Sequence, residues 1–226
     1  MRVAIYFTPA QDDPLTQNAA HWLGRDAFDG KPTRGDDPES DAIVADPARY
    51  GFHATLKAPF HLAAGKTLAE LNTALASFSS TRAGISLGPL SLTRIGSFLA
   101  LTPHEKSDAL AALEADVRTA FEPFRASLTE AEIARRRPDK LSTRQRQNLE
   151  HWGYPHVGPD FRFHMTLTGP IDETALGLAE NRLRAQFGDL LDRAVVVDAL
   201  SLFVEPEPRS PFLIHTRHKL RVPAYG

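Results

Sequence analysis

Cysteine is absent from this chain of 226 residues. The absence excludes a disulfide framework, a thiolate nucleophile and a metal site built on cysteine. Long apolar runs are also missing: no segment reaches the length of a membrane span, and the N-terminal stretch lacks the apolar core of a secretory signal. We therefore expect a cytoplasmic protein that makes no contact with a membrane.

An excess of positive charge is missing as well. The formal net charge is −2, and the chain is 42% hydrophobic and 24% charged, which is ordinary for a soluble globular protein. Such a balance gives no overall attraction to nucleic acid or to an anionic membrane, so any affinity for an anion must be local. A nucleotide-binding phosphate loop is excluded too, because the stretch AGKT (64–67) would need glycine at position 60, where Phe60 stands.

An internal repeat is the most informative feature that is present. The stretch YGFHATLKAPF (50–60) recurs as FRFHMTLTGPI (161–171), and the similarity continues downstream over about 50–104 and 161–218. Five positions of the motif are identical: Phe52 and Phe163, His53 and His164, Thr55 and Thr166, Leu56 and Leu167, Pro59 and Pro170. The repeat predicts two related halves.

Hydrophobic periodicity predicts the same order of elements in both halves. A motif strand ends at a turn with proline, and a helix and two strands follow. The helices are expected at 67–80 and 172–187, with Thr67 and Asp172 as N-caps, and the strands at 85–95, 97–102, 194–204 and 211–217. The sequence thus predicts an α+β fold: two pseudo-symmetric β-α-β-β lobes whose antiparallel sheets face a central groove.

The rest of the chain frames these repeats. We expect a strand at 2–9, a helix at 14–28, a loop at 29–49, a helix at 107–124 and a basic helical insertion at about 129–155 that breaks at Pro138. No polar linker separates autonomous units, so residues 1–226 are expected to form a single bilobal domain.

Alternation along each motif strand separates a core face from a polar face. In the first motif His53, Thr55 and Lys57 lie opposite the apolar residues, and in the second Arg162, His164 and Thr166 do so. A pseudo-two-fold axis would bring the two polar faces together across one groove.

These groups suit a reaction that moves a proton at each end of an anion. One imidazole can accept a proton from a nucleophilic water while the other donates one to a leaving oxygen, and the sequence leaves open which histidine does which. Thr55 and Thr166 can donate to phosphoryl oxygens, and Lys57 and Arg162 can neutralise charge there. The pattern favours phosphodiester cleavage without a metal or cofactor. A metal site is disfavoured, since no carboxylate occupies either motif face.

The alternative to catalysis is a structural role. A single His-x-Thr on a strand is usually structural, but an outward polar pair that occurs twice beside basic residues is a poor structural requirement. Tyr6 on the first strand can reach the groove if that strand neighbours a motif strand. Arg136 and Arg144 of the basic insertion form either a solvated helix face or a lid that clamps a second phosphate.

The paired F-H-x-T-L motifs resemble those of the two-histidine phosphoesterase superfamily, which includes RNA 2′,3′-cyclic phosphodiesterases, RNA ligase-like enzymes and plant cyclic phosphodiesterases. The resemblance spans nearly the whole chain. It implies two lobes around a groove, His53 and His164 as the catalytic pair, and Thr55 and Thr166 as phosphate ligands.

The segments RYGFHATLKAPF (49–60) and 135–170 are also similar to a bacterial branch associated with phosphonate-utilisation operons. That similarity implies a small phosphorylated sugar as substrate, such as a ribose cyclic phosphate. We expect the protein to be a monomer. RNA is a less favoured partner, because the basic residues of the insertion are not interleaved with aromatic ones. Two alternatives stay open: an RNA-processing cyclic phosphodiesterase or ligase, and a non-catalytic phosphate-ligand binding protein.

Overall fold

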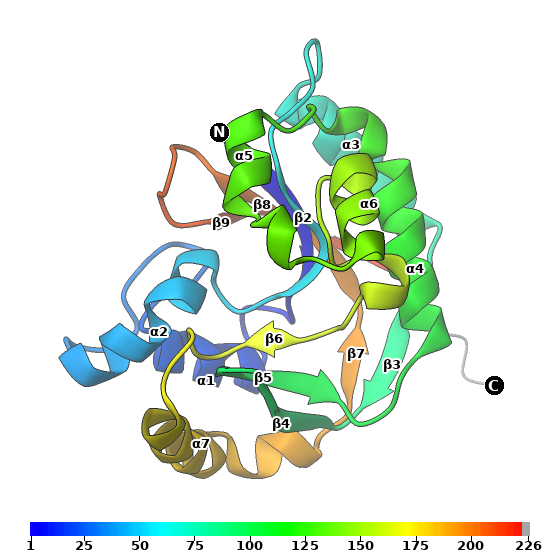
Figure 1. Cartoon of the computed structure of the whole chain (residues 1–226). Coiled ribbons are helices and arrows are strands. Elements are labelled where there is room, and N and C mark those ends of the chain that lie inside the picture. The colour runs from blue at the N-terminus through cyan, green and yellow to red at the C-terminus, as the bar shows by residue number, and fades with distance from the viewer. Residues whose placement is uncertain (223–226) are drawn as a thin grey trace.

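A seven-stranded antiparallel sheet organises residues 1–222, the part of the chain that this computed structural model describes (Figure 1). In chain order the helices and strands are β1 (Arg2–Phe7), α1 (Pro14–Leu23), α2 (Pro38–Tyr50), β2 (Ala54–Phe60), α3 (Leu68–Ser80), β3 (Ile85–Gly88), β4 (Leu90–Ile95), β5 (Phe98–Pro103), α4 (Asp108–Ala120), α5 (Glu130–Arg135), α6 (Thr143–Trp152), β6 (Met165–Thr166), α7 (Glu173–Phe187), β7 (Val195–Val197), β8 (Ala199–Glu205) and β9 (Leu213–Lys219). Short 3₁₀ helices cover 122–124, 138–140, 158–160 and 188–192.

Strands of both repeats belong to this one sheet. The strand order is β4-β5-β6-β2-β1-β8-β9, so the two motif strands β2 and β6 are neighbours near its centre. The remaining strands, β3 and β7, pair with each other as a separate two-stranded sheet. Three strands follow each repeat helix where the sequence predicts two. In the first repeat Pro89 separates β3 from β4, since proline cannot donate to the ladder.

The two faces of the sheet are covered differently. Val3, Ile5 and Phe7 of β1 join the main apolar core, whose helical residues come mainly from α1, α3, α4 and α7. Ala4 and Tyr6 point to the other face, where they join a small cluster with Ala27, Phe203 and Phe212 and two partly buried residues at its edge. The alternation predicted for the first strand is confirmed, and it leaves one face of the sheet available for a site.

Helix starts follow the predicted capping chemistry. At the start of α3 the Thr67 side chain accepts from the Glu70 N–H, and the Glu70 carboxylate accepts from the Thr67 N–H, which completes a capping box. Asp172 caps α7. The basic insertion consists of two helices, α5 and α6, with a 3₁₀ turn at Pro138 between them. The α+β class and the antiparallel pairing are thereby confirmed. The pseudo-symmetry of the two lobes and their boundaries remain predictions.

Three local expectations differ from the structure. The expected loop at 29–49 contains the helix α2, which starts with Pro38 at its first position and tolerates Pro47 inside its last turn. The helix expected at 14–28 ends at Leu23, because Gly24 adopts a left-handed conformation there (φ +78°). The motif strands are shorter than 50–60 and 161–171, so both histidines stand just before a strand.

Within residues 1–222, no helix combines the length and apolar character that crossing a membrane requires.

Gly51 closes α2 and sets the direction in which the chain enters the first motif. Its backbone angles, φ +77° and ψ 176°, lie in a region that only glycine occupies easily. A Cβ at this position would lie 2.5 Å from the Cβ of Ala27. The position therefore excludes a side chain for two separate reasons.

Replacement Gly51→Ala is expected to lower the free energy of unfolding by about 3 kcal/mol, because backbone strain and the clash with Ala27 add. Gly65→Ala is the matched control. Gly65 has nearly the same φ of +76° but nothing within 4 Å of its Cβ position, so about 1–2 kcal/mol is expected from the backbone alone. Urea denaturation monitored by circular dichroism measures both, and equal losses would contradict the steric argument.

Candidate active site

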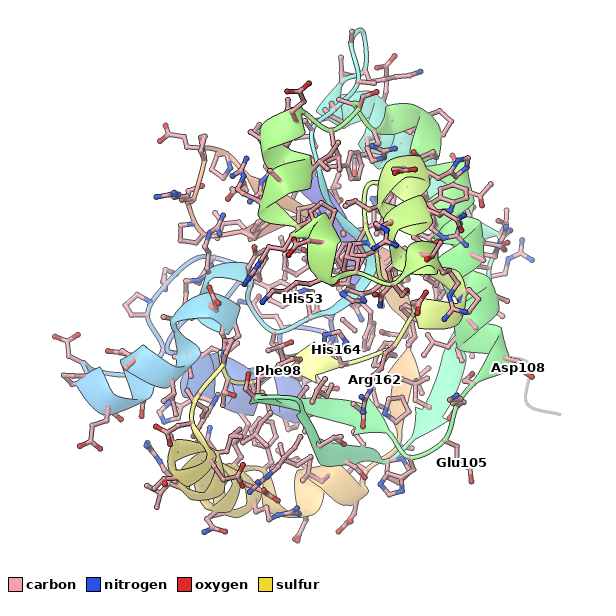
Figure 2. The ribbon with its side chains drawn as sticks, in the orientation of Figure 1. His53, Phe98, Glu105, Asp108, Arg162 and His164 are labelled. Carbon is pink, nitrogen blue, oxygen red and sulfur yellow. The ribbon has the colours of Figure 1, made fainter. Side chains whose placement is uncertain are left out.

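The pairing of β2 with β6 brings the two motifs together. Ala54 lies opposite Met165 in this antiparallel ladder. Thr55 therefore lies opposite His164, and His53 opposite Thr166, on one face of the sheet. All four side chains line a single cavity of about 350 Å³, and Figure 2 shows the two histidines close together near the centre of the molecule. The structure thus assembles the four residues that the sequence singled out.

Both imidazoles are oriented by the same backbone contact. The Nδ1 of His53 lies 2.9 Å from the carbonyl oxygen of Gly51, and the Nδ1 of His164 lies 2.8 Å from that of Arg162. A carbonyl only accepts, so Nδ1 carries the proton in both neutral rings. Each Nε2 then offers a lone pair to the cavity, as a general base requires.

His53 is enclosed by aromatic rings. Tyr6 stacks on it with centroids 3.8 Å apart and planes inclined by 21°, and Tyr50 and Phe203 lie about 6 Å away. The pKa of His53 is lowered from its ordinary value of 6.5 to about 4, mainly by burial. The hydrogen bond to Gly51 acts to raise this pKa, and the charge of His164 acts to lower it. His53 is accordingly neutral at physiological pH.

His164 stands at a more open position, with the ring of Phe98 6.0 Å away. Burial lowers its pKa below 6.5, the hydrogen bond to the Arg162 carbonyl raises it, and the positive charges of Arg162 and His156 lower it. An anion bound in the cavity would raise the pKa again, because it stabilises the imidazolium.

Tyr6 comes from β1, which neighbours β2 and places Tyr6 opposite Thr55. Its side chain is 1% exposed, and burial raises its pKa well above the ordinary value. The structure brings Tyr6 to the cavity as the ring that supports His53. Thr55 lies beside the same imidazole, with its hydroxyl oxygen 3.4 Å from Nε2.

Lys57 departs from the expectation. It is only 5% exposed, and its ammonium group donates to the Glu122 carboxylate at 2.8 Å and to the Arg118 carbonyl at 3.2 Å. Its positive charge is therefore already paired. Lys57 still lines the cavity that contains Thr55 and His164 and adjoins the first one, and its role as a phosphate ligand remains a prediction. The strand pairing of β1 with β2 is irregular near Lys57, which breaks the simple alternation of faces.

The three predicted arginines are separated. Arg136, at the C-terminal end of α5, lines the cavity that contains both histidines. Arg162 is exposed, lines an adjoining cavity together with His164, and makes no ion pair with any residue in 1–222. Arg144 forms an ion pair with Asp160 at 2.7 Å and lines none of the cavities around the histidines, so the structure does not bring it to the other predicted site residues.

The adjoining cavity has a volume of about 650 Å³ and continues from Thr55 and His164. Aromatic side chains form part of its wall: Phe98, Trp152, Tyr154 and Phe161. The guanidinium of Arg118 lies over the ring of Trp152 at 4.2 Å, which holds that wall in place. One side of the histidine pair is therefore suited to a planar or apolar group.

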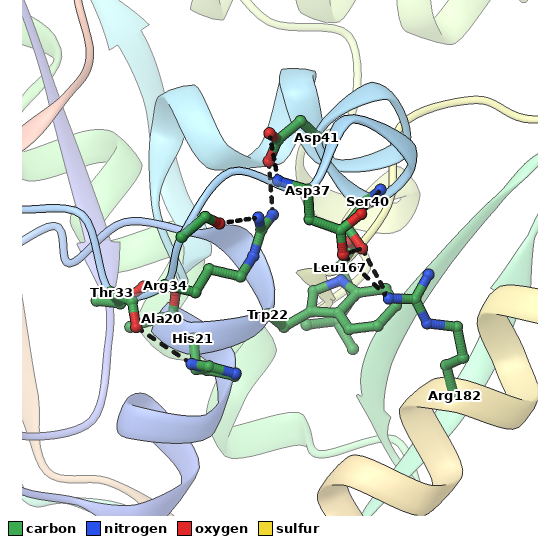
Figure 3. A network of polar contacts seen from close by, with 11 residues as sticks. Ala20, His21, Trp22, Thr33, Arg34, Asp37, Ser40, Asp41, Leu167 and Arg182 are labelled. Carbon is green, nitrogen blue, oxygen red and sulfur yellow. Dashed lines mark hydrogen bonds and ion pairs between the residues drawn. The ribbon is translucent and has the colours of Figure 1, made fainter.

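The second motif is held by contacts beyond its two-residue strand. The Trp22 indole N–H donates to the Leu167 carbonyl at 2.7 Å, and Arg182 lies over the Trp22 ring while donating to Ser40 at 2.7 Å (Figure 3). The hydroxyl of Thr168 accepts from the Leu99 N–H at 3.0 Å. Helices α1, α2 and α7 thus fix a segment that has little regular strand structure of its own.

Two charged residues of the cavity were not anticipated. Arg2 lines it from the start of β1, and Asp46 lines it from α2. Arg2 could have been found, because it shares a strand face with Tyr6. Asp46 could not, because its helix was expected to be a loop.

Throughout residues 1–222, no group of three or more histidine, aspartate or glutamate side chains is placed so as to hold a metal ion.

Solved structures align with nearly the whole chain at low identity. They are a phosphoesterase (15% identical, 97% of this chain and 98% of that one, TM-score 0.43), Escherichia coli LigT complexed with 3′-AMP (14%, 97% and 98%, 0.44) and TT0787 of Thermus thermophilus (12%, 98% and 99%, 0.47). All three TM-scores lie below 0.5.

Curated relatives are more similar in sequence. Two proteins described as ribose 1,5-bisphosphate phosphokinase PhnN match, one from Janthinobacterium sp. (strain Marseille) at 34% identity over 222 residues and one from Laribacter hongkongensis (strain HLHK9) at 35% over 225. Each alignment covers 94% of this chain but only 49% and 50% of the relatives, so the chain spans about half their length. A family model described as "Protein of unknown function (DUF1045)" matches residues 55–213, and the chain therefore belongs to the DUF1045 family.

Proposed function

We propose that the protein is a phosphodiesterase that opens a small cyclic phosphodiester by general acid–base catalysis, without a metal. The observation that carries the proposal is the matched orientation of His53 and His164. Both expose Nε2 to one cavity, and each stands opposite the threonine of the other motif. A structural role requires no such duplication of an outward-facing base.

The reaction balances with these groups alone. The Nε2 of one histidine takes a proton from water as the water oxygen forms a bond to phosphorus. The bond from phosphorus to one ring oxygen breaks, and the protonated Nε2 of the other histidine gives its proton to that oxygen. The product is an open phosphate monoester, and one further proton exchange with solvent restores the enzyme.

The pKa shifts of the two histidines support one assignment of the two roles. His53 has a pKa of about 4, held low by burial, so it is neutral and serves as the base. His164 is more open, and the phosphate anion beside it raises its pKa on binding, so it carries the proton and serves as the acid. The substrate thus supplies the charge that activates the acid.

Hydroxyls and guanidinium groups stabilise the phosphoryl oxygens in this scheme. Thr55 and Thr166 donate from the two strands, and Arg136 and Arg162 bring positive charge from opposite sides of the cavity.

A ribose cyclic phosphate is the preferred substrate. The names of the curated relatives include ribose 1,5-bisphosphate, which supports a phosphorylated ribose as the substrate of this chain. The kinase activity in those names belongs to proteins twice as long. In this chain the stretch 60–67 does not form a phosphate loop that would support it.

A cyclic nucleotide or an RNA with a cyclic end is the second candidate. The cavity of about 650 Å³ beside His164 favours it, because Trp152, Tyr154 and Phe161 could stack on a base. Phosphorus NMR on a ribose cyclic phosphate, a cyclic mononucleotide and a short RNA with a cyclic end separates these substrates. A ligand that binds without turnover would instead indicate a binding protein.

Replacing either catalytic histidine with alanine is expected to lower kcat by about 10²–10⁴, because each variant loses one proton-transfer step. His104→Ala is the matched control, since His104 is exposed and lines none of the cavities. Thermal denaturation checks that the variants fold. Full turnover by a folded His53→Ala or His164→Ala protein would rule out the mechanism.

The pH dependence of kcat/KM is expected to report the ionisation of the two histidines in the free enzyme. Activity requires His53 without its extra proton, so it rises through a pKa of about 4, and it requires protonated His164, so it falls with increasing pH from below 6.5 upward. The falling limb of kcat should lie at higher pH than that of kcat/KM, because the bound anion raises the pKa of His164. A rate that increases between pH 6 and 8 would contradict these assignments.

Treatment with a chelator such as EDTA is expected to leave kcat unchanged, since the proposed steps use only protein side chains. The assay compares treated enzyme with enzyme supplied with Mg²⁺, Mn²⁺ or Zn²⁺. Loss of activity on chelation, with recovery on adding one of these ions, would replace the two-histidine mechanism with a metal-dependent one.

A further inference from the structure

A second cavity, of about 440 Å³, adjoins the catalytic one. The two share Arg2, Tyr50, Pro59 and Arg136 among their lining residues, so they form one continuous depression. Five arginines line this second cavity: Arg2, Arg49, Arg135, Arg136 and Arg209. They come from β1, α2, α5 and the loop between β8 and β9, which lie far apart in the sequence.

The carboxylates present cannot neutralise these arginines. Only Glu132 and Glu205 line the same cavity, so five cations face two anions. Glu132 is already engaged in capping α5, where it accepts from the N–H and the hydroxyl of Thr129. The excess of positive charge is local, because the whole chain carries a net charge of −2. Like charges gathered in this way repel one another unless an anion joins them.

Glu205 orders one side of the cavity. It is 1% exposed, forms ion pairs with Arg2 and Arg49, and accepts from the backbone N–H of Arg209 at 3.1 Å. Burial acts to raise its pKa, but the hydrogen bonds from the two guanidinium groups lower it overall, so the carboxylate stays charged. Two guanidinium groups are thereby held in place before any ligand arrives, which reduces the entropy lost on binding.

Several guanidinium groups in this cavity lack an acidic partner, and one of their donors has no acceptor. The Nε of Arg49 is buried and makes no hydrogen bond in the described structure. Arg135, Arg136 and Arg209 form no ion pair with a residue in the range 1–222. A buried donor without an acceptor is costly, and a guanidinium matches the geometry of a phosphate. The cavity therefore has the charge, the donors and the rigidity of an anion site.

We infer that this cavity binds a second phosphate group of the substrate while the cyclic phosphodiester lies between His53 and His164. The substrate class is then a cyclic phosphodiester that also carries a phosphate monoester. The inference rests on the proposed function for the position of the first phosphate. The insertion contributes Arg135 and Arg136, and the other three arginines come from outside it.

A pair of nucleotides tests the inference by kinetics: adenosine 2′,3′-cyclic phosphate with and without a 5′-phosphate. The 5′-phosphorylated compound is expected to have the higher kcat/KM, by a factor of about 10–100. One or two charge-assisted hydrogen bonds provide a gain of this size. In the double variant Arg135→Gln/Arg209→Gln the ratio should fall close to one, mainly through KM. The matched control is Arg184→Gln/Arg193→Gln, which removes two exposed arginines that line neither cavity and should keep the native ratio.

Calorimetric binding of adenosine 3′,5′-bisphosphate and adenosine 3′-monophosphate gives a measurement that needs no turnover. Tighter binding of the bisphosphate by the native protein, lost in the double variant and kept in the control, supports the second phosphate site. The same result without turnover of either cyclic compound supports this site and counts against the proposed function alone.

Equal affinity for the two nucleotides overturns the inference, as does a preference that survives in the double variant. A titration with inorganic phosphate completes the set. Free phosphate that binds at the arginines, with no preference between the two nucleotides, would show a site for a separate anion and would also overturn it.

Discussion

The pairing of β2 with β6, with Ala54 opposite Met165, is the constraint on which the site depends. The register places each histidine opposite the threonine of the other motif, although the two motifs are more than a hundred residues apart. A slip of one residue would turn these polar groups into the core. The ladder is short, and the buried contacts of Trp22 and Thr168 with the second motif supply the precision that two residues of strand cannot.

Charge around the histidine pair is distributed unequally. One side has Arg162 and an aromatic wall, and the other has Arg136 and a cavity with an excess of arginine. Burial favours the neutral form of both imidazoles in the free protein. The positive charge that attracts an anion to the cavities therefore comes from the guanidinium groups. The proposed mechanism therefore gives binding and proton transfer to different side chains, and a bound anion would couple them by raising the pKa of His164.

The sequence predicted much of the fold, because repeated periodicity and capping residues such as Thr67 are local signals. It predicted that the polar residues of each motif lie on the same face, since their alternation with apolar residues is also local. It did not predict that Lys57 is neutralised, because its partner Glu122 is distant in sequence and the strand pairing nearby is irregular. Helix α2 was missed because its prolines and acidic residues resemble those of a loop. The arginine cavity depends on side chains gathered from four separate segments, which no sequence pattern reports.

The contact between each Nδ1 and a backbone carbonyl has a consequence for how the site can vary. A carbonyl does not titrate and cannot be removed by exchanging a side chain, so the tautomer of each neutral ring does not depend on which residue stands two positions before the histidine. That position is Gly51 in one motif and Arg162 in the other. The residue at this position can therefore differ between the two motifs. Gly51 allows a sharp change of chain direction in one, Arg162 places a positive charge beside the cavity in the other, and both neutral imidazoles keep the same tautomer.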